Sequence, residues 1–266
     1  MPERAAEVLV ERREHVVIVS INRPEARNAV NLAVTQGVGD ALDEAERDPT
    51  VRAVVITGVG DRSFCAGADL KAIATGEPMF PPGKEHWGFA GLCRHFISTP
   101  VIAAVNGTAL GGGTEIVLAS DLAIAAEHAT FGLPEVKRGL IAGAGGAFRI
   151  AEQLPAKLAS HVLLTGDPID AQTALRWGLI NEVVASGREL DAALRLAGRI
   201  AVNAPLSVRA SKRLARRVFP DSVEPQGDAE AWAASAGEGK QILASADMKE
   251  GVAAFAEKRP PVWTGR

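Results

Sequence analysis

The sequence predicts an α/β protein with a helical C-terminal region, and two patterns in its 266 residues lead to this prediction. Through residue 200, short runs rich in Val, Ile and Ala alternate with segments that have apolar residues at helical spacing. This alternation is typical of strands joined by helices. After Pro205 the pattern remains helical without a strand-like run. We therefore expect a core over residues 1–200 and a helical region over residues 201–266.

Four segments have the apolar, β-branched composition of buried strands. They are residues 15–21, 51–57, 101–105 and 121–126. Helical spacing predicts further elements at residues 26–47, 206–218, 229–244 and 247–258. Residues 75–91 are rich in proline and glycine, and we expect a mobile loop there.

Composition and charge indicate an ordinary globular protein. Hydrophobic residues make up 47% and charged residues 23% of the chain, and the net charge of −3 gives no reason to expect nucleic acid or an anionic membrane as a partner. No run approaches 18 apolar residues, and the N-terminus lacks a signal-like apolar core. The two cysteines suit a reducing compartment. These features together predict a cytoplasmic protein.

A local basic stretch lies in the C-terminal region. Its members recur at intervals of three to four residues on one predicted helix, and they are Arg209, Lys212, Arg213, Arg216 and Arg217. Charges at this spacing are typical of one helix face. We expect that face to be solvated.

The most informative stretch runs from the strand at residues 101–105 through Gly111-Gly112-Gly113 to Glu115. Glycines let the backbone turn sharply and approach other groups closely. The following residues, 114–119, have the composition of a helix, and the amides at a helix start have no intrahelical acceptor. Such amides can hold an oxyanion beside the carboxylate of Glu115. The alternative is an ordinary tight turn with Glu115 on a solvated face.

A second carboxylate, Glu135, follows the apolar residues 131–134. Apolar surroundings disfavour the charged form and could keep this carboxyl protonated enough to act as an acid. The alternative is a surface turn residue. Glu115 and Glu135 together, with glycine-rich turns nearby, indicate acid–base chemistry beside a carbonyl more strongly than either does alone.

Other chemistries lack their sequence patterns. The five histidines show no paired metal-ligand spacing, the cysteines form no CxxC, and GxSxG, Walker A and GxGxxG motifs are missing. Cys65 has no histidine near it in sequence, so we interpret it as a small buried residue rather than a nucleophile.

Several blocks resemble the signatures of the crotonase (enoyl-CoA hydratase/isomerase) superfamily. The principal ones are residues 63–71, 103–115 and 131–135, and supporting ones are 22–24, 143–146, 165–166, 174–180 and 255–259. They run in the family's order over nearly the whole chain. The resemblance implies a crotonase-like spiral of ββα units followed by a helical region that assembles a homotrimer, often paired into a hexamer (a dimer of trimers).

The resemblance also implies an acyl-coenzyme A thioester as substrate, with no metal and no cofactor beyond the coenzyme A of the substrate. The backbone N–H groups of Ala68 and Gly112 match the family's oxyanion hole, and Glu115 and Glu135 match its two catalytic glutamates. In the usual account the first glutamate activates water and the second exchanges a proton at C2. The residues expected to bind coenzyme A are Arg23, Ala26, Ala66, Asp69, Leu70, Lys71, Phe255 and Lys258.

Because both glutamates are present, hydration of a 2-enoyl-CoA, or the reverse dehydration, is the first expectation. Another crotonase activity such as double-bond isomerisation remains open, as does a non-catalytic acyl-CoA-binding paralogue. Residues 88–92 and 257–266 are similar to the carnitinyl-CoA dehydratase branch. In the last predicted helix, Met248, Val252 and Phe255 share one face, which we expect at a trimer interface near coenzyme A.

Overall fold

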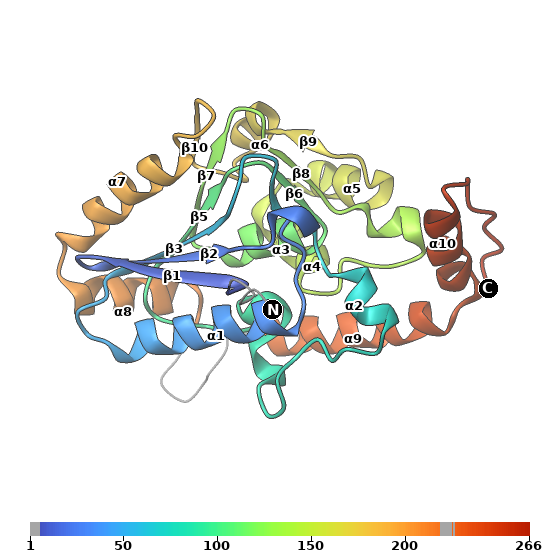
Figure 1. Ribbon diagram of the computed structural model, residues 1–266, viewed down its shortest axis with the longest axis horizontal. Coiled ribbons are helices and arrows are strands. Elements are labelled where there is room, and N and C mark those ends of the chain that lie inside the picture. Colours follow the sequence, from blue (N-terminus) through green and yellow to red (C-terminus); the bar gives the residue numbers. More distant parts are fainter. Residues whose placement is uncertain (1–5, 219–224, 226) are drawn as a thin grey trace, which may run out of the picture.

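The computed structural model describes residues 6–218, 225 and 227–266, and it contains two sheets and a set of surrounding helices (Figure 1). The larger sheet has the order β1-β2-β3-β5-β7-β10. Its strands are β1 (Val8–Arg13), β2 (Val16–Ile21), β3 (Ala53–Gly58), β5 (Val101–Val105), β7 (Leu122–Ala126) and β10 (Glu182–Val184). Only the β1–β2 pair of this sheet is antiparallel.

The smaller sheet has the order β4-β6-β8-β9. Its strands are β4 (Ser63–Cys65), β6 (Thr108–Leu110), β8 (Thr130–Gly132) and β9 (Ile169–Asp170). The β8–β9 pair is antiparallel and the other pairs are parallel.

Successive units of the chain place one strand in each sheet and then form a helix. Strands β3 and β4 precede α2 (Leu70–Ala74), β5 and β6 precede α3 (Gly112–Ala119), and β7 and β8 precede the 3₁₀ helix η4 (Pro134–Arg138) with α4 (Gly146–Gln153). This order confirms the expected α/β fold built as a spiral of ββα units.

The remaining helices cover the sheets and extend the C-terminal end. They are η1 (Pro24–Ala26), α1 (Leu32–Arg47), η2 (Glu85–Trp87), η3 (Phe89–Gly91), α5 (Ala156–Thr165), α6 (Ala171–Trp177), α7 (Glu189–Ala201), α8 (Pro205–Ala215), α9 (Asp228–Ala244) and α10 (Ala246–Glu257). Figure 1 shows α9 running along one side of the molecule toward α10 at one end. No helix among the described residues has the length and apolar content to cross a membrane.

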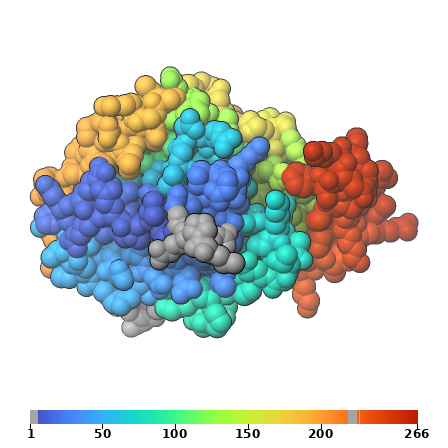
Figure 2. Space-filling view, viewed as in Figure 1, coloured from blue at the N-terminus to red at the C-terminus, as the bar shows by residue number. Residues whose placement is uncertain are grey.

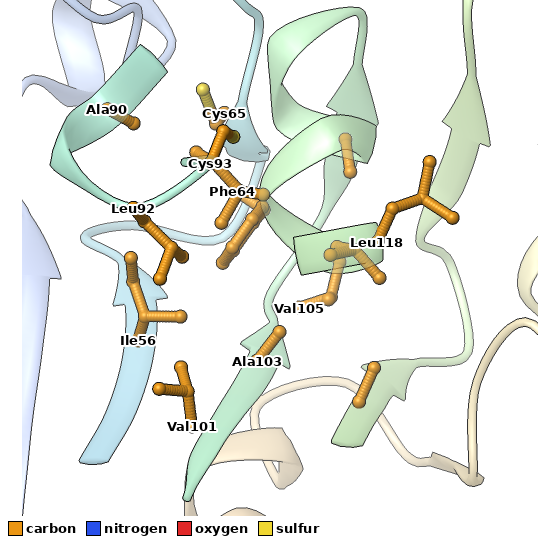
Figure 3. Packing of buried hydrophobic residues seen from close by; sticks show 14 of the residues in the cluster. Ile56, Phe64, Cys65, Ala90, Leu92, Cys93, Val101, Ala103, Val105 and Leu118 are labelled. Atoms are coloured by element: carbon orange, nitrogen blue, oxygen red, sulfur yellow. The ribbon is translucent and has the colours of Figure 1, made fainter. Parts of the chain in front are cut away.

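Helix α3 lies in the centre of the core. Figure 3 shows Leu118 of this helix near Val105 of β5, with Phe64 of β4 toward the other side of the helix, and all three side chains are buried. A helix that is apolar on nearly every side is stable only when other elements surround it. This packing encloses the N-terminal turn of α3, which carries Glu115, within the fold.

Helix α1 begins at Leu32, so the predicted start at residue 26 is wrong. Arg27 and Asn28 have φ angles of +54° and +55°, which interrupt helical geometry after η1. Asn28 is held there because its side-chain amide donates to the carbonyls of Val59 and Ser63. Asn31 then caps α1 by accepting from the Val34 amide.

The segment 75–91 is more ordered locally than expected. It contains η2 and η3, and Trp87 is only 1% exposed because it packs against Gly39 of α1. Phe89 and Ala90 are also buried. The interpretation of residues 85–91 as a plain loop is therefore wrong, whereas mobility of the segment stays a prediction.

The basic face of α8 docks on the core, so the expected solvated face is wrong for three of its members. The Lys212 ammonium lies 2.6 Å from a carboxylate oxygen of Asp121. Arg209 donates to the hydroxyl of Thr99 at 2.9 Å. Arg216 donates to the Ser120 carbonyl at the C-terminal end of α3. Helical spacing is the same for a solvated and a docked face, so the pattern could not distinguish them.

Candidate active site

Three glycines bring the N-terminus of α3 against its neighbours. A Cβ atom on Gly112 would lie 2.3 Å from the Phe89 ring, and one on Gly113 would lie 2.1 Å from the Cys65 carbonyl oxygen. Gly111 has φ +56°, and a Cβ there would lie 3.1 Å from a carboxylate oxygen of Glu135. Gly112 and Gly113 leave no room for a side chain, and the φ angle of Gly111 favours glycine, so the helix end can approach β4, η3 and η4 closely.

Two backbone amides at this place are available to a ligand. Val30 donates to the Gly67 carbonyl and accepts from the Asp69 amide, and this bridge leaves the Ala68 N–H unused. A Cβ on Gly67 would lie 3.4 Å from the Gly112 nitrogen, so the two turns touch. Within the described part of the chain, neither the Ala68 nor the Gly112 amide donates to a protein acceptor. The arrangement can polarise a carbonyl oxygen.

Glu115 occupies the first turn of α3 and is only 3% exposed. One carboxylate oxygen accepts from the Gly146 amide at 2.9 Å. Burial raises the pKa of Glu115 to about 8, and the nearby Glu135 contributes in the same direction. The amides of Gly146 and Ala144 and the charge of Arg149 act against this rise. Glu115 can therefore hold or release a proton near neutral pH.

Glu135 lies on η4, directly after Pro134. Burial also raises its pKa. Its Oε2 atom is enclosed and has no hydrogen-bond partner among the described residues. An enclosed carboxylate oxygen without a partner is costly unless a ligand or a proton satisfies it. Two carboxyls with raised pKa values beside free amides can exchange protons with a bound carbonyl compound.

The structure brings together the six coenzyme A candidates nearest the N-terminus. Arg23 donates to Asp69 at 2.8 Å, and the Ala66 amide donates to Arg27, which places η1 with Ala26 beside the turn before α2. Asp69 caps α2, where Leu70 and Lys71 are exposed.

The Arg23 guanidinium itself is buried and engaged. It donates to the Ala29 carbonyl at 2.6 Å and lies 3.4 Å from Glu7 as well as beside Asp69. These contacts brace the loop. The role of Arg23 in binding coenzyme A stays a prediction.

The profile of the family described as "Enoyl-CoA hydratase/isomerase" matches residues 11–266. The chain belongs to this family. The superfamily resemblance seen in the signature blocks is thereby confirmed, with the fold that it implied.

Several proteins similar to this chain are named for a particular hydratase or dehydratase activity. "Carnitinyl-CoA dehydratase" of Proteus mirabilis is 41% identical over 256 residues, covering 96% of this chain and 97% of that protein. A crystal structure of carnitinyl-CoA hydratase from Mycobacterium avium is 60% identical with a TM-score of 0.96, covering 98% and 99% of the two chains. An enoyl-CoA hydratase from Mycobacterium tuberculosis is 43% identical with a TM-score of 0.76, covering 98% and 100%.

The last two residues expected to bind coenzyme A lie at the end of α10, away from the other six. Phe255 and Lys258 are exposed at the end of α10, which packs on η4 and lies apart from α2 in Figure 1. The Phe255 ring lies 4.3 Å from the Arg138 guanidinium. Lys258 ends the helix with φ +55°. Their contact with a ligand stays a prediction.

Sequence reasoning missed two contributors to the site. The turn at residues 143–146 entered the sequence analysis only as a block of the family resemblance, and its Gly146 amide donates to the Glu115 carboxylate. Glycines before a helix indicated a free amide without indicating its acceptor. Arg149 belongs to no pattern that marks a site in the sequence, although its charge acts on Glu115. The buried Cys65 fits its expected packing role, and burial raises the pKa of its thiol to about 12.

Proposed function

We propose that this protein adds water across the C2–C3 bond of a 2-enoyl-CoA, or removes it from the 3-hydroxyacyl-CoA. The observation that carries the proposal is the pair of enclosed carboxyls, Glu115 and Glu135, beside the unused amides of Ala68 and Gly112. Binding alone would not require two carboxyls with raised pKa values. Acid–base catalysis at a thioester requires them.

The two amides would accept the thioester oxygen and stabilise the negative charge that forms on it. One such donor is typically worth about 3–4 kcal/mol in the transition state. In hydration, an ionised carboxylate takes a proton from water as its oxygen bonds to C3. The electron pair of the C2–C3 bond moves onto the thioester as an enolate, which then takes a proton at C2. We assign water activation to Glu115 and protonation at C2 to Glu135, as the family resemblance implies.

The reaction moves only water and protons, so we propose no cofactor beyond the coenzyme A of the substrate and no metal. Hydration changes no oxidation state overall, and the amides take the place of a Lewis acid at the carbonyl. We further propose a cytoplasmic homotrimer or hexamer. Its support is the exposed apolar side chains of α8 to α10, such as Leu206, Leu243 and Val252, which a second copy would cover.

For the acyl group we propose the carnitinyl chain, whose C4 carries a trimethylammonium group. The names of the similar proteins support this choice. A permanent cation loses hydration when it enters a closed site and requires compensating negative charge. Ionisation of Glu115 or Glu135 beside the bound cation would supply that charge, whereas an uncharged acyl chain would not favour this ionisation.

The test compares three substrates with the purified full-length protein. Two of the substrates are 2-enoyl-CoAs: crotonyl-CoA and the enoyl-CoA formed by dehydrating carnitinyl-CoA. Their hydration is followed by the loss of the conjugated thioester absorbance. The third substrate is a 3-enoyl-CoA, whose isomerisation is followed by the appearance of that absorbance. We expect hydration of both 2-enoyl-CoAs, with at least about tenfold higher kcat/KM for the cationic one. Isomerisation without hydration would refute the proposed reaction. Acyl-CoA binding without turnover would identify a non-catalytic protein.

A further inference from the structure

We propose that Arg149 is a positioning residue for Glu115 and that helix α9 holds Arg149 in place. The C-terminal helical region is in this way coupled to the acid–base centre of the same chain. The inference rests on the proposed function for the meaning of Glu115, and one readout below does not require activity.

The Arg149 guanidinium is enclosed on several sides. Only 10% of the side chain is exposed. One nitrogen donates to the Cys93 carbonyl at 2.6 Å, and another lies 3.5 Å from a carboxylate oxygen of Asp228 on α9. The rings of Phe148 and Trp232 each lie 5.4 Å from its central carbon. A planar guanidinium held by a carbonyl, a carboxylate and two rings has a defined position.

The turn that contacts Glu115 is fitted around this guanidinium. Gly146 donates its amide to the Glu115 carboxylate at 2.9 Å. The preceding Gly145 has φ +99°, and a Cβ there would lie 2.9 Å from an Arg149 nitrogen and 3.1 Å from the Trp232 ring. Arg149 and Trp232 therefore pack closely against the turn that presents the Gly146 amide to Glu115.

Helix α9 contributes one face to this arrangement. Asp228, Trp232 and Ser235 are spaced four and three residues apart, which places them on the same side of the helix. Asp228 pairs with Arg149, Trp232 covers Arg149 and Gly145, and the Ser235 hydroxyl donates to the Gly143 carbonyl at 3.4 Å. Three successive contacts thus connect α9 with the segment between residues 143 and 149.

The charged groups around Glu115 and Arg149 determine whether loss of Arg149 raises or lowers the pKa of Glu115. Glu115 is faced by Glu135 from η4 and by Arg149 from α4. The un-ionised thiols of Cys65 and Cys93 also face it. Around Arg149, a cavity of about 480 Å³ is also lined by charged side chains from the neighbouring elements. They are Arg94, Asp121, Glu152, Lys212, Arg216, Arg217 and Asp228. The charge of Arg149 favours ionised Glu115.

The first experiment measures the pH dependence of kcat/KM for Arg149→Gln, Arg149→Lys and Arg216→Gln. Loss of the opposite charge that acts on Glu115 should move the limb of the pH profile set by Glu115 upward in Arg149→Gln, by up to about one unit. Arg149→Lys should retain the limb while losing several-fold in kcat, because an ammonium cannot make the guanidinium's paired contacts. Arg216→Gln is the matched control, since it removes a charge from the same cavity and should leave the limb in place.

The second experiment follows the carboxyl directly by ¹³C NMR of glutamate-labelled protein, with the Glu115 signal assigned from Glu115→Gln. The titration midpoint should rise in Arg149→Gln and stay unchanged in Arg216→Gln. If the wild-type protein turned over no enoyl-CoA, the proposed function would fail, whereas this titration would still decide the coupling.

Variants on α9 test the second half of the proposal. Trp232→Leu and Asp228→Asn should also raise the titration midpoint of Glu115, but by less than Arg149→Gln does. Each should lose several-fold in kcat. Unchanged midpoints in Arg149→Gln and in both α9 variants would overturn the inference. If Arg149→Gln does not fold, the α9 variants decide the outcome by the same criterion.

Discussion

The spiral core and the C-terminal helices of this protein differ in how they are held. In the core, α3 is buried along nearly its whole length by apolar neighbours. In contrast, α8 and α9, which are described in full, contain no fully buried residue, and Leu206 and Leu214 of α8 are 81% and 69% exposed. Figure 2 shows the C-terminal residues, in red, gathered at one end of the molecule. The core folds around its own apolar groups, whereas α8 docks on it through polar contacts, and we propose that partner copies cover the exposed apolar side chains.

Charge is also used differently in the two regions. The core keeps Glu115 and Glu135 enclosed without a cationic partner bonded to either one in the described residues. At the C-terminal helices, the enclosed Lys212 has its counter-charge in Asp121. Buried charges that are paired maintain structure at little net gain, whereas unpaired ones are costly. An unpaired carboxyl in a well-packed core is therefore the stronger indication of chemistry.

The largest expected effect tests the role of the unpaired carboxyls. Glu115→Gln and Glu135→Gln should each lower kcat by about 10²–10⁴-fold, because an amide cannot transfer the proton. Acyl-CoA affinity should stay largely intact, which calorimetry with a non-reactive acyl-CoA would measure. A variant with near-normal hydratase activity would remove that glutamate from the mechanism.

Removal of α10 tests the dependence of the helical region on partner copies. A chain ending before Asp247 should no longer form the trimer or hexamer that we propose, because Val252 and Phe255 would be lost from the uncovered apolar surface. Sedimentation velocity measures the oligomer, and the hydratase assay measures the consequence. A fully active, monomeric truncated protein would contradict both the assembly and its link to function.

The docked lysine gives the next largest effect. Lys212→Met should cost about 1.5–3 kcal/mol in the free energy of unfolding, because Asp121 would lose the nearer of its two cationic partners and keep only Arg216, at 3.5 Å. Chemical denaturation measures the loss. Lys212→Met/Asp121→Asn should recover part of it, and Arg213→Met, on the exposed side of the same helix, is the control. A Lys212→Met variant as stable as Arg213→Met would show that the Lys212–Asp121 ion pair contributes nothing to stability.

The raised pKa of Glu115 predicts a pH-dependent stability. The folded protein holds this proton up to a pKa of about 8, and the ordinary value is 4.5. The contribution of this proton to the free energy of unfolding is fully present below pH 4.5 and is lost as the pH rises through about 8. Glu115→Gln should therefore raise the Tm at pH 9 relative to wild type by at least about 3 °C more than at pH 5. The exposed Glu25→Gln is the control, and equal shifts at both pH values would contradict the enclosed, protonated carboxyl.

The sequence predicted those parts of the fold that depend on local pattern. Apolar runs located β5 and the body of α3, and glycines before a helix placed Glu115 correctly. The turn at Arg27 was missed because its geometry depends on bonds between Asn28 and distant carbonyls. The environment of Arg149 was missed for the same reason, since α9 enters it from about 80 residues further along the chain. Local propensity contains no information on such partners.

The smallest expected effect concerns Lys258, which ends α10 as an exposed side chain. The family resemblance implies that it pairs with the phosphates of coenzyme A. An ammonium on a flexible chain acts there as a point charge, and its attraction is screened by salt. The alternative is a solvated charge at a helix C-terminus, which favours such a cation without any ligand.

Lys258→Ala should raise the KM for acyl-CoA several-fold with little change in kcat, because phosphate binding is equally strong in the ground and transition states. Lys249→Ala, an exposed lysine on the same helix, is the matched control and should leave KM unchanged. Added potassium chloride should reduce the difference between wild type and Lys258→Ala, since screening weakens the wild-type contact alone. If both lysine variants had the same KM at every salt concentration, Lys258 would be the solvated charge of the alternative, and α10 would contact substrate through no cation at this position.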